Sequence, residues 1–321
     1  MEPTERGQTA VHIQARELTT AQTRAYLRIM RRLKNSDGVL RYGEIAKNRT
    51  DERLLAALTE AGEIEKIGFG CYAAPQSELP AQIAQRFKAK LTCISAVEFG
   101  GMRTLSPPEG IHIAVERNRG LELPRDLIET TVVHRESKSW LNEKSESKQY
   151  RLTSDGFKET KLIAPWSAVF ARVAICQPFY SAVVAIDSGL AQKLTSKERI
   201  LNLIPRFRYP DAVRAVQLAS GTSQSVLESI ARVKLVLAGF KVAAQQEIKE
   251  VGSVDLVVED TVVVELDGYA YHADRKQFRK DRARDRILVQ KGYRVLRYAF
   301  EDVIQSPETL VHDVHRLLAD S

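Results

Sequence analysis

VVVELDGYAYH, at residues 262–272, joins three valines to two acids, two tyrosines and a histidine. A valine run of this kind is typical of a strand inside a sheet, where an unpaired carboxylate costs several kcal/mol. Asp267 and Gly268 form an Asp-Gly pair, a strong turn signal that accounts for an acid at the end of the strand. Glu265 lies within the run itself, and a turn does not explain it. The pattern therefore points to a functional acid at Glu265.

The preceding segment SVDLVV, residues 253–258, is expected to pair with the valine run as an antiparallel hairpin. If residues 259–261 form a three-residue loop, Asp255 faces Glu265, whereas a two-residue loop would place Leu256 there. Two carboxylates opposite each other destabilise a sheet unless a cation lies between them. A hard divalent ion such as Mg²⁺, which takes oxygen ligands, is the natural occupant.

Helical and strand periodicities continue on both sides of this hairpin and define a C-terminal unit over residues 223–321. Its order is α-β-β-β-α-β-α, with glycines ending two of the helices and Ser306 and Pro307 beginning the last. The expected segments are a helix at 223–240, strands at 241–248, 253–258 and 261–267, a helix at 276–292, a strand at 293–299 and a helix at 306–320.

Positive charge is concentrated directly after the opening stretch. Residues 274–297 hold ten lysines and arginines against three aspartates, an excess of seven that equals the net charge of +7 for the whole chain. A local basic field of this kind indicates a polyanionic partner such as nucleic acid. The alternative is a solvated helix face stabilised by ion pairs one turn apart.

The N-terminal part predicts a small DNA-binding module over residues 18–78. Three helical segments, the third with Thr50 or Asp51 as N-cap, precede the hairpin sequence IEKIGFGCYAA. This is the order of a winged helix-turn-helix, in which the third helix enters the major groove and the hairpin is the wing. Arg53 is the basic residue near the start of the third helix. A helical module used for protein contacts is the alternative.

The rest of the chain is less informative. Residues 79–222 predict a mixed α/β domain in which His112 and His134 are expected to be structural, and residues 135–150 an exposed loop. The apolar stretch at 164–186 contains an arginine and two prolines and is expected to form core helices rather than a membrane span.

Composition and cysteine usage favour a cytoplasmic globular protein. A hydrophobic share of 44% and a charged share of 28% fit globular domains, and the N-terminus has no secretory signal. The three cysteines, Cys71, Cys93 and Cys176, are odd in number and lack metal-ligand spacing. We therefore expect a reducing setting, with residues 1–17 as a flexible tail.

Residues 223–321 resemble the Vsr-like (very short patch repair) branch of the PD-(D/E)XK, or restriction-endonuclease-like, nucleases. The pieces that match are SVLES, VDLVV, VVVELDGYAYH, DRARDRILVQKGYRVLRYAF and the closing helix. More weakly, residues 18 to about 220 resemble the AbiEi-type antitoxin proteins, which begin with a winged helix. The fold expected is thus a multidomain α+β and α/β protein with a C-terminal restriction-endonuclease-like αβββαβ core.

The resemblance implies roles for individual residues. Asp255 and Glu265 would bind the metal, Glu228 on the first helix would assist, and His272 would activate or position water. Asp267 stands where the lysine of the family motif would fall, so that the lysine's role passes to His272 or to a lysine of the basic helix, or is lost. Basic residues expected to contact DNA are Lys276, Lys280, Arg282, Arg284, Arg286 and Arg53.

Two of these acids have other readings. Ser225 and Glu228 also fit a capping box, in which the glutamate accepts a hydrogen bond from the backbone. Asp267 also fits the turn described above. His272 taken alone is more typical of a surface or packing residue.

The function predicted is that of an endonuclease using Mg²⁺ or Mn²⁺ to hydrolyse duplex DNA, targeted by the winged helix, in defence or repair. Left open are a non-catalytic DNA-binding regulator of antitoxin type with a degenerate nuclease-like domain, and a structural protein whose acids are neutralised by the arginine-rich helix. A toxin or defence-system partner and a homodimer also fit the resemblance. No membrane partner is expected.

Overall fold

The computed structural model describes residues 19–142, 148–267 and 275–319, and the side chains of all of these except 275–281 and 307. The expected flexible tail at 1–17 lies outside this range. The chain divides into two compact units. The first unit comprises Met1–Gly100 and Pro108–Pro165, and the second comprises Gly101–Pro107 and Trp166–Ser321.

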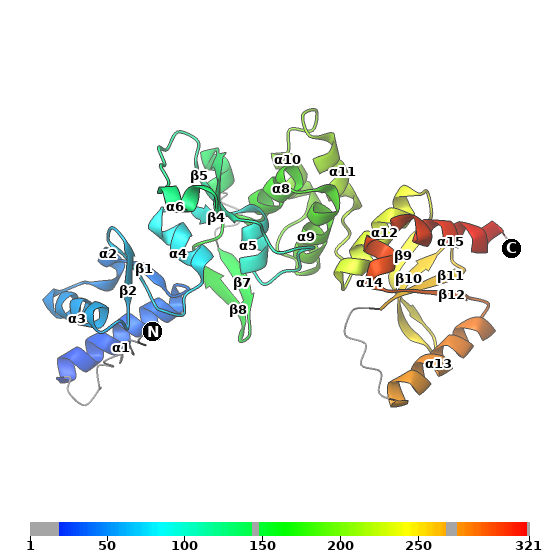
Figure 1. The fold of residues 1–321 in the computed structure, drawn as a ribbon, viewed down its shortest axis with the longest axis horizontal. Coiled ribbons are helices and arrows are strands. Elements are labelled where there is room, and N and C mark those ends of the chain that lie inside the picture. The colour runs from blue at the N-terminus through cyan, green and yellow to red at the C-terminus, as the bar shows by residue number, and fades with distance from the viewer. Residues whose placement is uncertain (1–18, 143–147, 268–274, 320–321) are drawn as a thin grey trace, which may run out of the picture. The chain divides into compact units, whose positions relative to one another are not determined.

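The first unit begins with three helices and three short strands (Figure 1). Ala25, Ile29 and Leu33 recur on one face of the first helix and are buried in a core shared with Leu54 and Leu58 of the third. The strands form a sheet of order β1-β3-β2, and the predicted hairpin is confirmed as β2 and β3. The elements are α1 (Thr20–Asn35), β1 (Val39–Arg41), α2 (Tyr42–Ile45), α3 (Arg49–Glu60), β2 (Glu65–Gly68) and β3 (Cys71–Ala73).

Helix α3 has its N-cap two to three residues earlier than the sequence suggested. Its N-cap is Asn48, whose side chain accepts a hydrogen bond of 3.0 Å from the backbone N–H of Asp51. The prediction of Thr50 or Asp51 as N-cap is therefore wrong. Asp51 is instead fully buried and forms an ion pair with Arg28 of α1. That pair joins the first and third helices.

The remainder of the first unit is mixed α/β. One sheet has the order β4-β5-β6 with β5 and β6 parallel, and β7 and β8 form a separate hairpin. The predicted loop at 135–150 is wrong in its described part, because it contains the end of β6, a short helix and the start of β7. The elements are α4 (Leu79–Arg86), β4 (Lys90–Leu91), α5 (Cys93–Phe99), β5 (Ile111–Glu116), α6 (Arg125–Ile128), β6 (Thr131–Glu136), α7 (Lys138–Leu141), β7 (Gln149–Thr153) and β8 (Gly156–Thr160).

The second unit opens with four helices, of which the first two come from the apolar stretch at 164–186. Both are buried along most of their length, as the core-helix interpretation predicted. Among the described residues, no helix combines the length and apolarity that crossing a membrane requires. The helices are α8 (Trp166–Cys176), α9 (Phe179–Ala191), α10 (Lys197–Leu203) and α11 (Pro210–Leu218).

The second unit continues into a four-stranded sheet of order β12-β11-β10-β9, in which only β11 and β12 pair in parallel. The predicted order of helices and strands is confirmed, with one additional short helix before the last. The elements are α12 (Val226–Leu237), β9 (Val242–Ile248), β10 (Gly252–Val258), β11 (Val262–Leu266), α13 (Arg275–Gln290), β12 (Arg294–Tyr298), α14 (Phe300–Ile304) and α15 (Pro307–Ala319).

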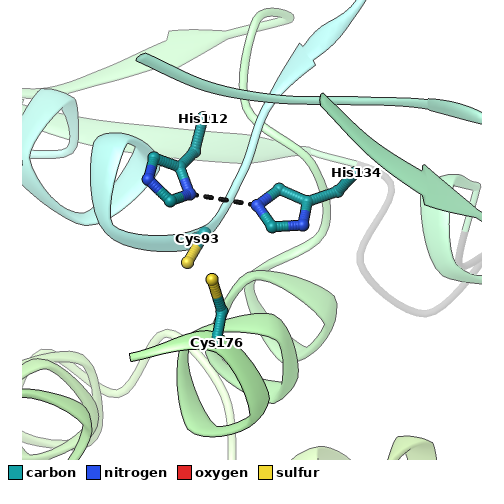
Figure 2. Close-up of side chains that lie close together, drawn as sticks. All are labelled: Cys93, His112, His134 and Cys176. Carbon is teal, nitrogen blue, oxygen red and sulfur yellow. Dashed lines mark hydrogen bonds between the residues drawn. The ribbon is translucent and has the colours of Figure 1, made fainter. Parts of the chain in front are cut away.

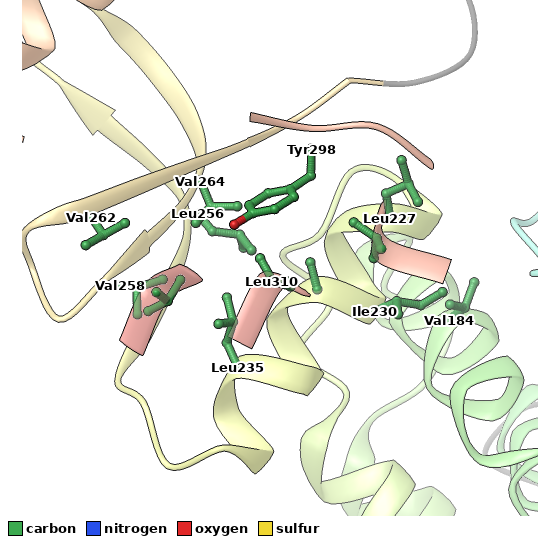
Figure 3. Packing of buried hydrophobic residues seen from close by; sticks show 13 residues of the cluster. Val184, Leu227, Ile230, Leu235, Leu256, Val258, Val262, Val264, Tyr298 and Leu310 are labelled. Atoms are coloured by element: carbon green, nitrogen blue, oxygen red, sulfur yellow. The ribbon is translucent and has the colours of Figure 1, made fainter. Parts of the chain in front are cut away.

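Helices cover both faces of this sheet (Figure 1). On one face, Leu256 and Val264 pack against α12, α14 and α15, in a core that also takes in Val184 of α9 (Figure 3). On the other face, Val257 and Val263 pack with Leu288 of α13. Because side chains alternate along a strand, Asp255 and Glu265 share the face of Val257 and Val263. The two acids therefore face the side of the sheet on which α13 lies.

Candidate active site

The hairpin of β10 and β11 has the register that brings two acids together. Leu256 pairs with Val264, so the next pair outward is Asp255 with Glu265. The loop is residues 259–261, and Glu259 and Asp260 adopt left-handed backbone conformations with φ of 47° and 57°. The predicted three-residue loop is thus confirmed, and the arrangement with Leu256 opposite Glu265 does not occur.

Glu265 is a buried acid, with only 5% of its surface exposed. Its Oε1 lies 3.0 Å from Nη2 of Arg284 on α13, yet this oxygen accepts no well-aligned hydrogen bond from any described residue. Burial raises the pKa of Glu265 to about 7; the charge of Arg284 opposes this shift, and the nearby Asp255 reinforces it. The site thus holds a carboxylate that exchanges its proton near neutral pH.

Asp255 is linked to Glu228 through Gln245. The Gln245 side-chain amide donates to Glu228 at 2.7 Å and to Asp255 at 3.4 Å, and the second Asp255 oxygen accepts from the backbone N–H of Leu266 at 2.8 Å. Gln245 and Asp255 lie between two pairs of the β9–β10 ladder, Val254 with Gln246 and Leu256 with Ala244, and Gln245 has a left-handed backbone, φ 54°. Three side chains from α12, β9 and β10 therefore form one connected polar group.

Glu228 also has a role at the start of α12. Ser225 is the N-cap and accepts from the backbone N–H of Glu228 at 3.1 Å. The Glu228 carboxylate accepts from the backbone N–H of Gln224 at 2.8 Å, one residue before the N-cap. Glu228 is only 4% exposed. The capping interpretation therefore holds in modified form, and it coexists with the contact to Gln245.

Asp267 lies in a second group of charges at the end of β11. Its carboxylate is 3.7 Å from Arg297 of β12, and Arg297 also pairs with Asp285 of α13 at 2.7 Å. Arg297 stands directly opposite Glu265 in the parallel ladder. Position 267, where the motif lysine was expected, is thus an acid next to an arginine.

The predicted site residues separate into three groups. Asp255, Glu265 and Glu228 are brought together, whereas Asp267 belongs to the adjoining charge group. His272, Lys276 and Lys280 lie outside the residues whose side chains the structure describes. Four arginines that were predicted to contact DNA have described side chains. Arg282 and Arg286 are exposed on α13, and Arg53 is exposed on α3. Arg284 is half-buried against Glu265.

The carboxylates do not form a closed set of three ligands. Within the described ranges, the only group of three or more candidate ligand atoms lying within 4.8 Å of one another is found elsewhere in the chain. A metal at this site would therefore rest on Asp255 and Glu265, with its remaining ligands being water, substrate or residues not described.

Sequence reasoning missed Gln245 and did not foresee the contacts that Arg284 makes within the domain. The register that places Asp255 against Glu265 also places Gln245 against Asp255, so strand pairing with β9 could have found it. The guanidinium of Arg284, a residue expected to contact DNA, pairs with Glu265 and donates to the backbone oxygen of Ser253; its contact with DNA stays a prediction. No sequence pattern distinguishes Arg284 from its exposed neighbours.

Comparisons with known proteins support the class of the C-terminal domain. Residues 224–318 match the family model described as REase_MTES_1575, and a restriction-endonuclease-like domain therefore occupies this part of the chain. No curated protein matches the sequence. The crystal structure of the RV2827C protein from Mycobacterium tuberculosis is similar at 18% identity, covering 69% of this chain and 82% of that chain, with a TM-score of 0.34. A similarity of this size defines neither fold nor activity.

Proposed function

We propose that the protein is a metal-dependent DNA endonuclease whose active centre lies at Asp255 and Glu265. The observation that supports this most is the buried Glu265, paired in register with Asp255, within a restriction-endonuclease-like domain. A buried acid opposite a second acid costs folding free energy. An active centre is where such an arrangement has a use.

Asp255 and Glu265 fit a hard divalent cation, Mg²⁺ or Mn²⁺. Glu265 Oε1 is buried without a well-aligned hydrogen bond among the described residues, and both acids offer the oxygen atoms such ions prefer. When bound, the ion would supply Lewis-acid activation of water and neutralise charge at the scissile phosphate. We assign these two residues as the ligands.

The surrounding residues orient the two acids. Gln245 donates to Asp255 and Glu228 together, and so fixes the direction of the Asp255 carboxylate. Arg284 is the cation next to Glu265, in a chain where the expected lysine is Asp267. We propose that Arg284 supplies the positive charge at this position and that His272 of the Vsr-like pattern takes or orients the proton of water.

Duplex DNA would be held by positively charged surfaces. Arg282 and Arg286 are exposed on α13, on the side of the sheet that the acids face, and suit backbone phosphates. We further propose that α1 to β3 form a winged helix of the AbiEi-type pattern, with the exposed Arg53 of α3 at the groove. A defence or repair role, a toxin partner and a homodimer follow from the resemblance alone.

The activity is tested by incubating the full-length protein with supercoiled plasmid in Mg²⁺ or Mn²⁺. We expect nicked and linear products that disappear with EDTA. Linear duplex and single-stranded DNA in parallel reactions define the substrate class. Absence of cleavage from every substrate in both metals would rule out the endonuclease.

A DNA-binding regulator with an inactive nuclease-like domain is the second candidate. It is favoured by the ion pairs of Arg284 with Glu265 and Arg297 with Asp267, which neutralise the acids without a metal. The regulator predicts tight duplex binding that neither EDTA nor Mg²⁺ alters, together with no cleavage. Metal-dependent nicking would exclude it.

A further inference from the structure

Three candidate metal ligands meet within the first unit, far from one another in sequence. Cys93 is the first residue of α5, His112 lies in β5 and His134 in β6 (Figure 2). The Cys93 thiol and one ring nitrogen of each histidine lie within 4.8 Å of one another. Cys93 is fully buried and His112 is 7% exposed. The group is thus a compact Cys-His-His cluster in which Cys93 and His112 are buried and His134 is partly exposed.

The parallel pairing of β5 and β6 places both histidines on one face of the sheet. His112 pairs with Val132, and His134 follows two residues later on the same side. Nδ1 of His112 lies 3.0 Å from Nε2 of His134, and the centroids of the two stacked rings are 5.2 Å apart. Two nitrogens bound to one tetrahedral zinc ion at Zn–N of about 2.0–2.1 Å would be about 3.3 Å apart. The observed spacing needs only a small expansion to accept the ion.

The cluster is held in place by backbone contacts rather than by the side chains alone. The backbone N–H of His112 donates to Ser95 Oγ at 2.9 Å, and its carbonyl accepts from the backbone N–H of Thr92 at 3.0 Å. Thr92 and Ser95 flank Cys93, which has a left-handed backbone with φ 51°. A left-handed cysteine costs of order 1–3 kcal/mol and persists where its surroundings enforce it. The position of the thiol against His112 is therefore fixed in advance.

We propose that Cys93, His112 and His134 bind a zinc ion that ties α5 to strands β5 and β6. Thiolate and imidazole ligands select zinc over Mg²⁺, which prefers oxygen, so this site differs in chemistry from the acid pair. With three protein ligands, the fourth position on the ion would be left for water, and the ion would link α5 to the two strands. Figure 2 also draws Cys176, which belongs to the second unit; the proposal rests on the three ligands of the first unit.

The alternative for the same residues is a plain hydrogen bond between the two imidazoles beside a buried thiol. The two arrangements exclude each other, because the hydrogen bond and the metal use the same two nitrogens. Metal content therefore decides between them. The proposal does not depend on nuclease activity.

The test is the zinc content of the full-length protein, purified without chelator from zinc-supplemented cells and measured by plasma mass spectrometry. We expect close to one zinc ion per chain in the unsubstituted protein. The double variant that combines Cys93→Ser with His134→Gln should contain no zinc. Cys71→Ser, which alters another buried cysteine, and Glu265→Gln, which alters the acid pair, should both retain it. Zinc that remains in the double variant, or an absence of zinc from the unsubstituted protein, would overturn the proposal.

A second measurement covers the case in which the double variant fails to fold. Cobalt added to metal-free unsubstituted protein should produce thiolate-to-cobalt charge-transfer absorption. The single variant Cys93→Ser should reduce this absorption and weaken cobalt binding at least ~10-fold. Cys71→Ser should leave both unchanged. If no thiolate absorption develops, or if Cys93→Ser leaves it intact, the zinc site is rejected.

Discussion

Glu265 owes its properties to the residues that surround it. It lies in a run of valines, faces Asp255 across the hairpin, and meets Arg284 from α13 and Arg297 from β12. Burial outweighs the two arginines, which is why its pKa rises to about 7. Small changes of pH around 7 therefore decide whether the Glu265 side chain is protonated and neutral or ionised.

This raised pKa makes stability depend on pH in a definite direction. From the ordinary value of 4.5 up to about 7, the folded protein keeps a proton on Glu265 that the unfolded chain has released. Stability therefore falls as pH rises through this window. In metal-free protein, the free energy of unfolding of Glu265→Gln, measured relative to the unsubstituted chain, should increase from pH 5 to pH 8. The expected increase is on the order of 1–2 kcal/mol, which allows for the partial exposure of the site to solvent. Urea unfolding at several pH values measures it, and a gain of zero would contradict the assignment.

Gln245 provides a test of the connection between Glu228 and Asp255. Gln245→Ala removes the amide that donates to both acids, leaving Asp255 less well oriented. We expect metal affinity and cleavage rate to fall about 10-fold to 100-fold, as for other residues that orient a ligand. Gln246→Ala, at the exposed neighbouring position, is the control and should change neither. Equal behaviour of the two variants would show that Gln245 has no positioning role.

At the scale of secondary-structure elements, a buried ion pair joins the nuclease-like domain to the helices before it. Arg232 of α12 pairs with Asp187 of α9 at 3.0 Å, and Asp187 also accepts from the backbone N–H groups of Ser220 and Gly221. Both ionised side chains are under 10% exposed. Together with Val184 in the core of the sheet, this pair makes α9 and α12 part of one packed unit.

Removal of one partner should be costly. Asp187→Ala leaves Arg232 buried without its counter-ion, and we expect a loss of about 3–5 kcal/mol in the free energy of unfolding. Lys241→Ala, which breaks the exposed pair with Asp260, should lower the free energy of unfolding far less, because water screens that pair. Denaturant unfolding compares the two. Similar small losses would mean that α9 and α12 do not depend on the ion pair.

The elements differ in how far sequence determines them. The β10–β11 hairpin could be predicted from its two apolar runs, but its register could not, because it depends on whether the loop has two or three residues. The N-cap of α3 could not, because Asn48 and Thr50 are both good caps and tertiary burial of Asp51 decides between them. The Cys93, His112 and His134 cluster was missed because it depends on the parallel register of β5 and β6, which neither strand specifies alone.

At the scale of the whole molecule, the chain combines a restriction-endonuclease-like domain at 224–318 with a mixed α/β first unit. The proposed zinc cluster and the proposed acid site lie in different units and use different ligand chemistry. Loss of one metal should therefore leave the other in place. The two units can be examined separately within the intact chain by substitutions confined to each.

DNA affinity provides the prediction at this scale. Changing Arg282 and Arg286 to Gln removes two exposed charges from α13, and we expect weaker duplex binding with a salt slope smaller by about two. Arg316→Gln, on α15 over the opposite face of the sheet, is the control and should not alter the slope. Fluorescence anisotropy at several salt concentrations gives both quantities. An unchanged slope in the double variant would place the DNA elsewhere.

The most direct test of the endonuclease is the plasmid-nicking rate of two matched variants. Glu265→Gln removes the charge of the buried acid, whereas Glu247→Gln makes the same chemical change at an exposed position of β9. With Mg²⁺ or Mn²⁺ present, we expect Glu265→Gln to lower the rate at least ~100-fold, and Glu247→Gln to leave it within a factor of two of the unsubstituted protein. Equal nicking by all three proteins would contradict an active centre at Glu265.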